Sequence, residues 1–169
     1  MLRRYGRCVG RDRRSEDRDV FVHVVTRGNN GGAIVRDQLD CELWRNELSR
    51  VATKYRWDVW AWCLMPNHLH LVLRAVHGGL SDGMQELNGN HARRMNRRHG
   101  RTGHLVQNRF FSVELESDSH LIAAGAYVMR NPLKAALCRR AEIVDGGHLP
   151  VSDTVAGVTA LGPAVMATG

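Results

Sequence analysis

The sequence lacks the features of a disulfide-bonded, zinc-binding or membrane protein. Its four cysteines form no CxxC pair and no zinc-like spacing, so we expect reduced, structural thiols of a cytosolic protein. No apolar run approaches the roughly 18 residues that a membrane helix needs, and the N-terminus contains no apolar segment typical of a signal peptide. The sequence therefore predicts neither export nor insertion into a membrane.

Lysine and aromatic residues are also scarce. Lys54 and Lys134 are the two lysines, yet 24 Lys and Arg against 17 Asp and Glu give a formal net charge of +7. This balance favours an anionic partner, with nucleic acid ahead of a membrane surface, although a GC-rich gene would also raise the arginine content. Aromatic residues make up 6% of the chain, which is thin for a surface that binds nucleic acid by base stacking.

Composition divides the chain into three parts. Residues 1–19 contain seven arginines mixed with acids and little that could be buried, so we expect a flexible basic arm. Residues 20–141 have the apolar periodicities of one domain. Residues 142–169 are rich in Gly, Ala and Val and have neither Lys nor Arg, which predicts a disordered or loosely docked tail.

Apolar periodicity predicts the order strand, helix, two strands, helix, strand and a final helix. We expect strands at 20–28, 57–65, 68–75 and 109–117, and helices after Asp37, over 81–98 and from about Asp118. Asp37 and Ser81 are the expected N-caps, and Pro66 with Asn67 marks a turn between the central strands. The sequence therefore predicts an α+β protein with a ferredoxin-like split β-α-β-β-α-β antiparallel sheet and an added C-terminal helix.

The stretch WCLMPNHLHLVLR, residues 62–74, places two histidines in a run that otherwise indicates a buried strand. Side chains of a strand alternate between its faces, so His68 and His70 should point the same way while Leu69, Leu71 and Leu73 point into a helix-covered core. Two neutral imidazoles at this spacing can hold one metal ion. An HxH pair alone is weak support, because surface or core histidines give the same pattern.

A tyrosine in the predicted final helix adds to this pattern. In AYVMRNP, Tyr127 and Asn131 are four residues apart and therefore share a helix face. A phenol beside a metal site can act as a covalent nucleophile, because a cation that polarises a phosphate assists attack at neutral pH. Without the two histidines, Tyr127 would be interpreted as a core aromatic residue.

Several motifs in this order resemble the single-tyrosine HUH transposases, specifically the bacterial REP-associated tyrosine transposases. They are HVVTRGNN, WCLMPNHLHLVL, MQELNGNHARRMNRRHGRTGHLVQNRF and YVMRNPLKAAL, between about Phe21 and Leu137. The resemblance implies a Mg²⁺- or Mn²⁺-dependent endonuclease and strand transferase that acts on single-stranded DNA with hairpin-forming repeats. It implies His68 and His70 as metal ligands, and Tyr127 as the nucleophile that forms a 5′-phosphotyrosine link and leaves a 3′-OH.

The resemblance also implies a polar ligand one helical turn after the tyrosine, where this chain has Asn131. The amide oxygen of Asn131 could bind Mg²⁺ or Mn²⁺, but an Asn before Pro132 is equally well explained as a helix cap. His120, seven residues before Tyr127 on the same predicted helix face, is the substitute ligand, and Glu114 is a weaker one.

Basic and amide side chains near these motifs are candidate DNA contacts. The run from 91 to 109 has six arginines and no acid, which favours phosphate contact over a merely solvated helix face. After the first strand, Arg27, Asn29 and Asn30 could contact bases or backbone, or could be turn residues only. His23 could face the same site or be a core histidine. The arginines of the run are Arg93, Arg94, Arg97, Arg98, Arg101 and Arg109.

Two other functions are compatible with the sequence. A nucleic-acid-binding module could keep this fold without catalysis, since a sheet of this topology is also an RNA-recognition platform. Hydrolysis by metal-activated water would leave Tyr127 as a packing residue. A covalent protein–DNA adduct separates these functions, because only the transposase would form one. For the transposase we expect a cytoplasmic, nucleoid-associated protein that is a monomer or a homodimer.

Overall fold

The computed structural model describes residues 20–75, 79–134 and 158–159, so the predicted arm at 1–19 and most of the predicted tail lie outside the described residues. In chain order the elements are β1 (Phe21–Arg27), a 3-10 turn η2 (Asn29–Gly31), α1 (Gln38–Lys54), β2 (Trp57–Leu64), β3 (His68–Ala75), α2 (Leu80–Arg98), β4 (Phe111–Leu115), α3 (Asp118–Lys134) and β5 (Val158–Thr159). The predicted α+β class and the order of its elements are confirmed.

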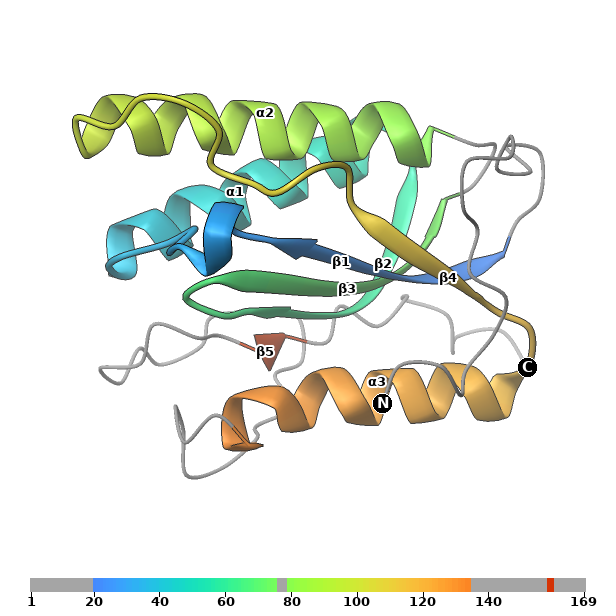
Figure 1. The fold of residues 1–169 in the computed structure, drawn as a ribbon. Helices are drawn as coiled ribbons and strands as arrows, with labels where there is room; N and C mark the ends of the chain where they lie inside the picture. Colours follow the sequence, from blue (N-terminus) through green and yellow to red (C-terminus); the bar gives the residue numbers. More distant parts are fainter. Residues whose placement is uncertain (1–19, 76–78, 135–157, 160–169) are drawn as a thin grey trace.

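The strands form one antiparallel sheet in the order β4-β1-β3-β2-β5 (Figure 1). The first four give the split arrangement that the sequence predicts, with β1 and β3 side by side in the centre. β5 was not predicted: its two residues pair with Trp62 and Cys63 of β2. Of the tail, the structure therefore places this short segment against the outer edge of the sheet.

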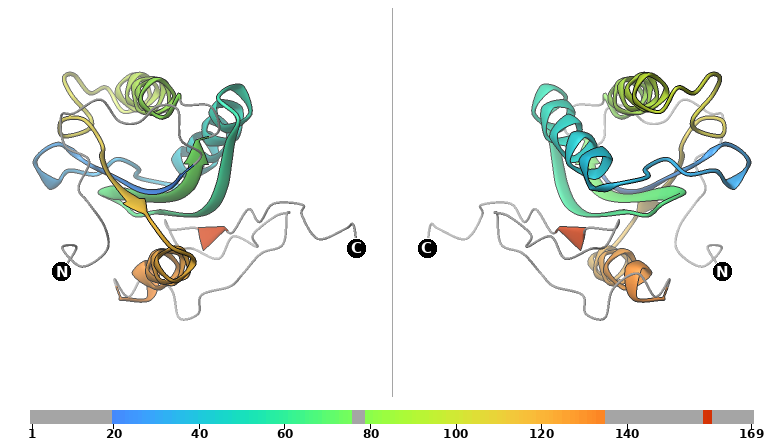
Figure 2. Two further views of the ribbon diagram at one scale, coloured as in Figure 1. Left: turned by 90° about the vertical axis from the view of Figure 1, so that its right-hand side faces the viewer. Right: turned by 90° about the vertical axis from the view of Figure 1, so that its left-hand side faces the viewer.

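Helices cover both faces of the sheet (Figure 2). α1 and α2 lie on one face, over a large core that contains Leu69, Leu71 and Leu73 of β3. Of the described helices, α3 is the one on the opposite face, over a smaller cluster that includes Val72 and Leu121. Alternation along β3 therefore assigns His68 and His70 to the face that α3 covers.

Of the two predicted N-caps, one is correct. Asp37 caps α1, where its Oδ1 accepts a hydrogen bond of 3.0 Å from the Asp40 backbone N–H. Ser81 does not cap α2, because the helix begins one residue earlier and follows Gly79. Gly79 has φ of 77°, a left-handed conformation that glycine adopts without steric cost.

Among the residues that the structure describes, no helix combines the length and the apolar character needed to cross a bilayer.

Candidate functional site

Four ring-bearing side chains from three elements meet under α3. The Tyr127 ring centroid lies 5.7 Å from that of His70 and 6.0 Å from that of His23. The His68 and His70 centroids are 5.0 Å apart, with ring planes at 85°. Residues that are distant in the sequence thus form one cluster of a phenol and three imidazoles on the α3 face.

The register of the strands explains why these side chains converge. β1 pairs with β3 so that Arg27 lies opposite His68 and His23 lies opposite Val72. Residues directly opposite in a ladder share a face, so His23 and Arg27 point toward α3 together with the two β3 histidines. The structure therefore places His23, itself a buried residue, beside His70 on the α3 face.

The histidines are less accessible than a metal site on an exposed strand would suggest. His70 is 3% exposed because α3 packs over it, while His68, at the start of β3, is half-buried. His70 is therefore a buried ligand candidate, and His68 is the more accessible member of the pair. The sequence pattern did not reveal this, because the HxH spacing says nothing about what covers the strand.

Hydrogen bonds fix one nitrogen of each ring in the HxH pair. His68 Nδ1 lies 2.8 Å from Asn67 Oδ1 and must be the donor, because a carboxamide oxygen can only accept. The other ring nitrogen of neutral His68, Nε2, therefore carries a lone pair. His70 Nδ1 and His23 Nε2 are 3.0 Å apart and share one proton between them. When His70 Nδ1 is the donor, its Nε2 also presents a lone pair, and His23 orients the ring.

All three histidines are held in the neutral form. Burial lowers the pKa of His70 to about 3 and the pKa of His23 to about 4. Burial also lowers the pKa of His68, with a smaller effect from the positive charge of Arg27. Neutral imidazole is the form that binds metal, so His68 and His70 fit a divalent cation as a two-nitrogen donor set.

Candidate third ligands differ in where they lie relative to the pair. α3 runs antiparallel to β3 (Figure 1), so the residues after Tyr127 approach the His68 end and the residues before it recede. Asn131 is one turn toward His68, and α3 continues through it to Lys134, which argues against the helix-cap interpretation. His120 is seven residues the other way, about 10 Å along the helix axis.

Glu114, the weaker substitute, lies on the other side of the sheet. It is directly opposite Val22, which belongs to the core under α1 and α2. Its carboxylate therefore starts from the face away from His68 and His70. This leaves Asn131 as the best-placed of the predicted third ligands, by its backbone position.

The six arginines of the run 91–109 do not form one surface. Arg98 Nη1 contacts both Asp37 and Asp40, and Arg94 pairs with Glu47 at 3.7 Å. Arg101 Nη1 donates to the Ala33 carbonyl oxygen at 3.1 Å. The side chains of these three are thus engaged with the protein, and Arg93 Nη2 also donates to Asn90 Oδ1. Arg93, Arg97, Arg98 and Arg109 are all exposed residues. Contact of any of the six with DNA stays a prediction.

The turn after β1 is attached to the segment that follows α2. Gln107 N donates to Arg27 O at 2.8 Å, and Asn29 N donates to Leu105 O at 2.9 Å. Asn30 has φ of 51° inside the 3-10 turn, which gives it a backbone role there. Arg27 is exposed and its charge is felt by both HxH histidines, so it is the predicted DNA contact nearest the site.

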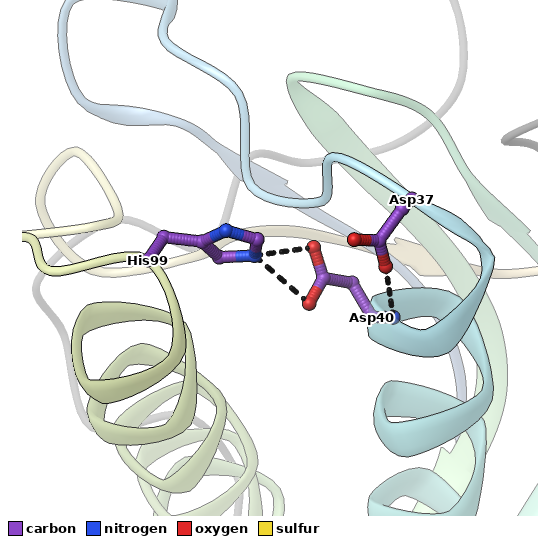
Figure 3. Close-up of side chains that lie close together, drawn as sticks. All are labelled: Asp37, Asp40 and His99. Carbon is purple, nitrogen blue, oxygen red and sulfur yellow. Dashed lines mark hydrogen bonds and ion pairs between the residues drawn. The ribbon is translucent and has the colours of Figure 1, made fainter.

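A second polar group, not predicted from the sequence, joins the start of α1 to the end of α2 (Figure 3). Asp37, Asp40 and His99 have ligand atoms within 4.8 Å of one another, the geometry of a possible metal site. However, Arg98 bonds to both carboxylates, and His99 Nε2 lies 2.9 Å from Asp40 Oδ2. A guanidinium already supplies the positive charge, so this group is better explained as an ion-pair clamp between the two helices.

Comparison with solved structures supports the fold. The structure of a REP-associated tyrosine transposase bound to a REP hairpin superposes with a TM-score of 0.63 at 15% identity, covering 79% of this chain and 78% of that one. A crystal structure described as a transposase from Deinococcus radiodurans gives 0.49 at 19% identity, covering 70% of this chain and 95% of that one. At these identities the likeness to the first structure shows a shared fold.

Sequence comparison identifies the family. No curated protein sequence matches this chain significantly. The sequence profile of the family described as IS200-like transposases matches residues 18–131, a range that contains β1 to β4 and the clustered histidines and tyrosine. This range is well over half of the chain, and the protein therefore belongs to the IS200-like transposase family.

Proposed function

We propose that this transposase is a metal-dependent single-stranded DNA endonuclease and strand transferase that uses Tyr127 as its nucleophile. The observation that carries the proposal is the packing of Tyr127 against His70 and His23, with His68 5.0 Å from His70 between ring centroids. A structural core does not need three neutral imidazoles around one phenol, because each buried imidazole must find hydrogen-bond partners. A phosphoryl-transfer site does need a nucleophile beside metal ligands.

The proposed reaction exchanges one phosphate ester for another. The Tyr127 oxygen attacks the phosphorus and loses its proton, while the bond from phosphorus to the 3′ oxygen breaks. The leaving oxygen takes up a proton to give a free 3′-OH, and the 5′ end stays linked to the tyrosine. Attack by a 3′-OH on this linkage reverses the step, so the same site rejoins strands.

His68 and His70 would hold the metal, with Asn131 as the proposed third ligand. When bound, Mg²⁺ or Mn²⁺ would polarise the phosphate and offset the charge that develops during attack. The chain's own contribution is to keep both rings neutral and oriented, through Asn67 at His68 and His23 at His70. Mn²⁺ accepts imidazole nitrogen more readily than Mg²⁺ does, so it is the better probe of this donor set.

The proposed DNA is single-stranded and carries a hairpin-forming repeat. The similar solved structure contains a REP hairpin, and this chain has the same fold together with a net positive charge of +7. Exposed arginines near the site, Arg27 first among them, would hold the phosphates of the approaching strand.

A denaturing gel tests the proposal. Wild-type protein incubated with labelled single-stranded repeat DNA and Mn²⁺ should give a cleaved strand and a protein–DNA adduct that survives denaturation. Tyr127→Phe removes one oxygen and keeps the ring packing, so it should bind DNA normally and form no adduct.

Each alternative function gives a different gel. Cleavage by Tyr127→Phe without an adduct would indicate metal-activated water, and DNA binding by the wild type without cleavage would indicate an inactive binding module. Tyr55→Phe is the matched control, because Tyr55 lies at the end of α1 and its hydroxyl donates to Glu86 Oε2 at 2.8 Å. It should cleave and link as the wild type does.

A further inference from the structure

The structure contains a cavity on the opposite face of the sheet from the histidines and Tyr127. It has a volume of about 740 Å³ and lies between α2 and the segment 103–110 that leads to β4. This volume is within the range of about 300–1,000 Å³ that is usual for small-ligand sites. No sequence pattern indicated it, because its two walls are brought together only by the return of the chain after α2.

The lining has the chemistry of a nucleotide site. Ala92 and Val106 give it a partly accessible apolar wall over the buried Met84, Leu105 and Phe110. Arg93 and Arg109 are exposed arginines at its wall, and Arg93 Nη2 donates to Asn90 Oδ1. The remaining lining residues include four carboxamides and no Asp or Glu, all within the described part of the chain. Amides can pair with base edges, arginines with phosphate, and an apolar wall accepts a base plane. The carboxamides are Gln85, Asn88, Asn96 and Asn108.

A glycine in the middle of α2 supplies an independent observation. Gly89 lines the cavity at a helix-interior position, where glycine destabilises a helix relative to alanine. A Cβ at Gly89 would meet only Arg93 Nη1, at 3.8 Å, so packing within the protein does not require glycine. At Gly83 of the same helix a Cβ would lie 2.3 Å from the Trp57 ring, which does require it. Packing among the described residues therefore does not account for a glycine at position 89.

The cavity is also connected to the catalytic face. Its wall at Leu105 and Val106 is joined to the turn after β1 by the Asn29–Leu105 hydrogen bond and by a β-bridge from Gly28 to Val106. Arg27, which precedes this turn, lies opposite His68. A strand held in the cavity could therefore pass over this edge of the sheet toward Tyr127.

We propose that this cavity binds an unpaired nucleotide of the DNA substrate, with its base inside and its phosphate at Arg93 and Arg109. The inference rests on the proposed action on single-stranded DNA. It assigns the α2 cavity to holding an unpaired part of the strand, at a distance from the phosphate that is cleaved.

Fluorescence anisotropy with labelled 12-mers tests this assignment in the full-length protein. The probes are dA12, dC12 and dT12, together with a 12-mer of abasic sites that keeps the sugar–phosphate backbone. Gly89→Leu fills the cavity, so it should weaken binding of the best base-containing 12-mer by about tenfold and leave abasic binding unchanged. Gly89→Ala improves helix propensity and should therefore fold. It should lower the ratio of base-containing to abasic affinity less than Gly89→Leu does.

Gly125→Leu is the matched control. Gly125 also lies within a helix and does not line the cavity, and a Cβ added there would meet no described atom within 4 Å beyond its own helical turn. It should leave the ratio of base-containing to abasic affinity as in the wild type. An unchanged ratio in Gly89→Leu and Gly89→Ala would overturn the assignment. Binding of these 12-mers requires no cleavage, so the result stands or falls separately from the adduct test of Tyr127.

Discussion

The two faces of the central sheet differ in both size and chemistry. Under α1 and α2 the described residues include a cluster of 20 buried apolar residues, with three tryptophans among them. Under α3 the corresponding cluster has eight, beside the buried polar rings of His23 and His70. The first face thus supplies most of the hydrophobic stabilisation, and the acids buried there, Asp40 and Glu47, are held in ion pairs, whereas the second face buries two neutral histidine rings. Most of the stabilising core and the residues of the proposed chemistry therefore lie on opposite faces of one sheet.

The largest expected effect tests the stabilising face. Leu71→Ala deletes a side chain that is fully buried under α1 and α2, and should lower the free energy of unfolding by about 2–5 kcal/mol. Urea denaturation followed by circular dichroism measures this loss. Ile122→Ala, at a residue of α3 that is 69% exposed, should stay within about 0.5 kcal/mol of wild type. Equal losses in both variants would show that burial under α1 and α2 does not determine the loss.

The next effect sharpens the chemistry of the α3 face. His23 is not a proposed ligand but is 3.0 Å from His70 Nδ1, so His23→Ala should weaken Mn²⁺ binding by about 10- to 100-fold through the orientation of His70. Isothermal titration calorimetry measures the affinity, and His68→Ala should lose more because it removes a ligand. The exposed residue His104 provides the control: His104→Ala should bind Mn²⁺ as wild type does.

Two adjacent arginines distinguish structural from DNA-binding charge. Arg97 is exposed, so Arg97→Ala should keep the wild-type melting temperature. It should also reduce the slope of log affinity for single-stranded DNA against log salt by about 0.7, because one phosphate is no longer neutralised. Arg98 pairs with Asp37 and Asp40, so Arg98→Ala should lower the melting temperature and change the slope less. The opposite pattern would mean that the ion-pair clamp does not form in solution.

The smallest effect is the acid dependence of that clamp. Burial alone raises the pKa of Asp40, but hydrogen bonds from Arg36 N, His99 and Arg98 outweigh it and hold the pKa below that of an unfolded aspartate. A lowered folded-state pKa contributes stability above the unfolded value of about 4, and the contribution disappears as pH falls through the folded pKa. The difference in stability between wild type and Arg98→Ala should therefore shrink below about pH 4 in urea titrations. A difference that stays constant across that range would contradict this.

Local patterns in the sequence predicted most of the fold. Strand and helix periodicities gave the order of elements, and Asp37 was identified as a cap because N-capping depends on residues three positions apart. Ser81 was wrong as a cap, because α2 begins at Leu80 and its N-cap is Gly79, whose positive φ no local pattern in the sequence revealed. β5 was missed because two residues carry no periodicity.

The candidate site was predicted only in part. Its HxH pair and Tyr127 stand out in the sequence, but no local pattern shows that His23 joins them, since its place depends on the register of β1 against β3. The acid-free run of arginines gives no sign that Arg94 and Arg98 pair with carboxylates on and beside α1, because these acids lie far away in the sequence.

The sequence by itself determined which residues share a face, because alternation along a strand and the turn of a helix are local properties of the backbone. It therefore determined that His68 and His70 lie on one face of their strand and that Tyr127 and Asn131 lie on one side of their helix. Only the tertiary structure decided that α3 covers the histidine face, that His70 is buried there, and that the α2 cavity exists. These follow from sheet register and the packing of distant segments, which depend on contacts across the whole chain.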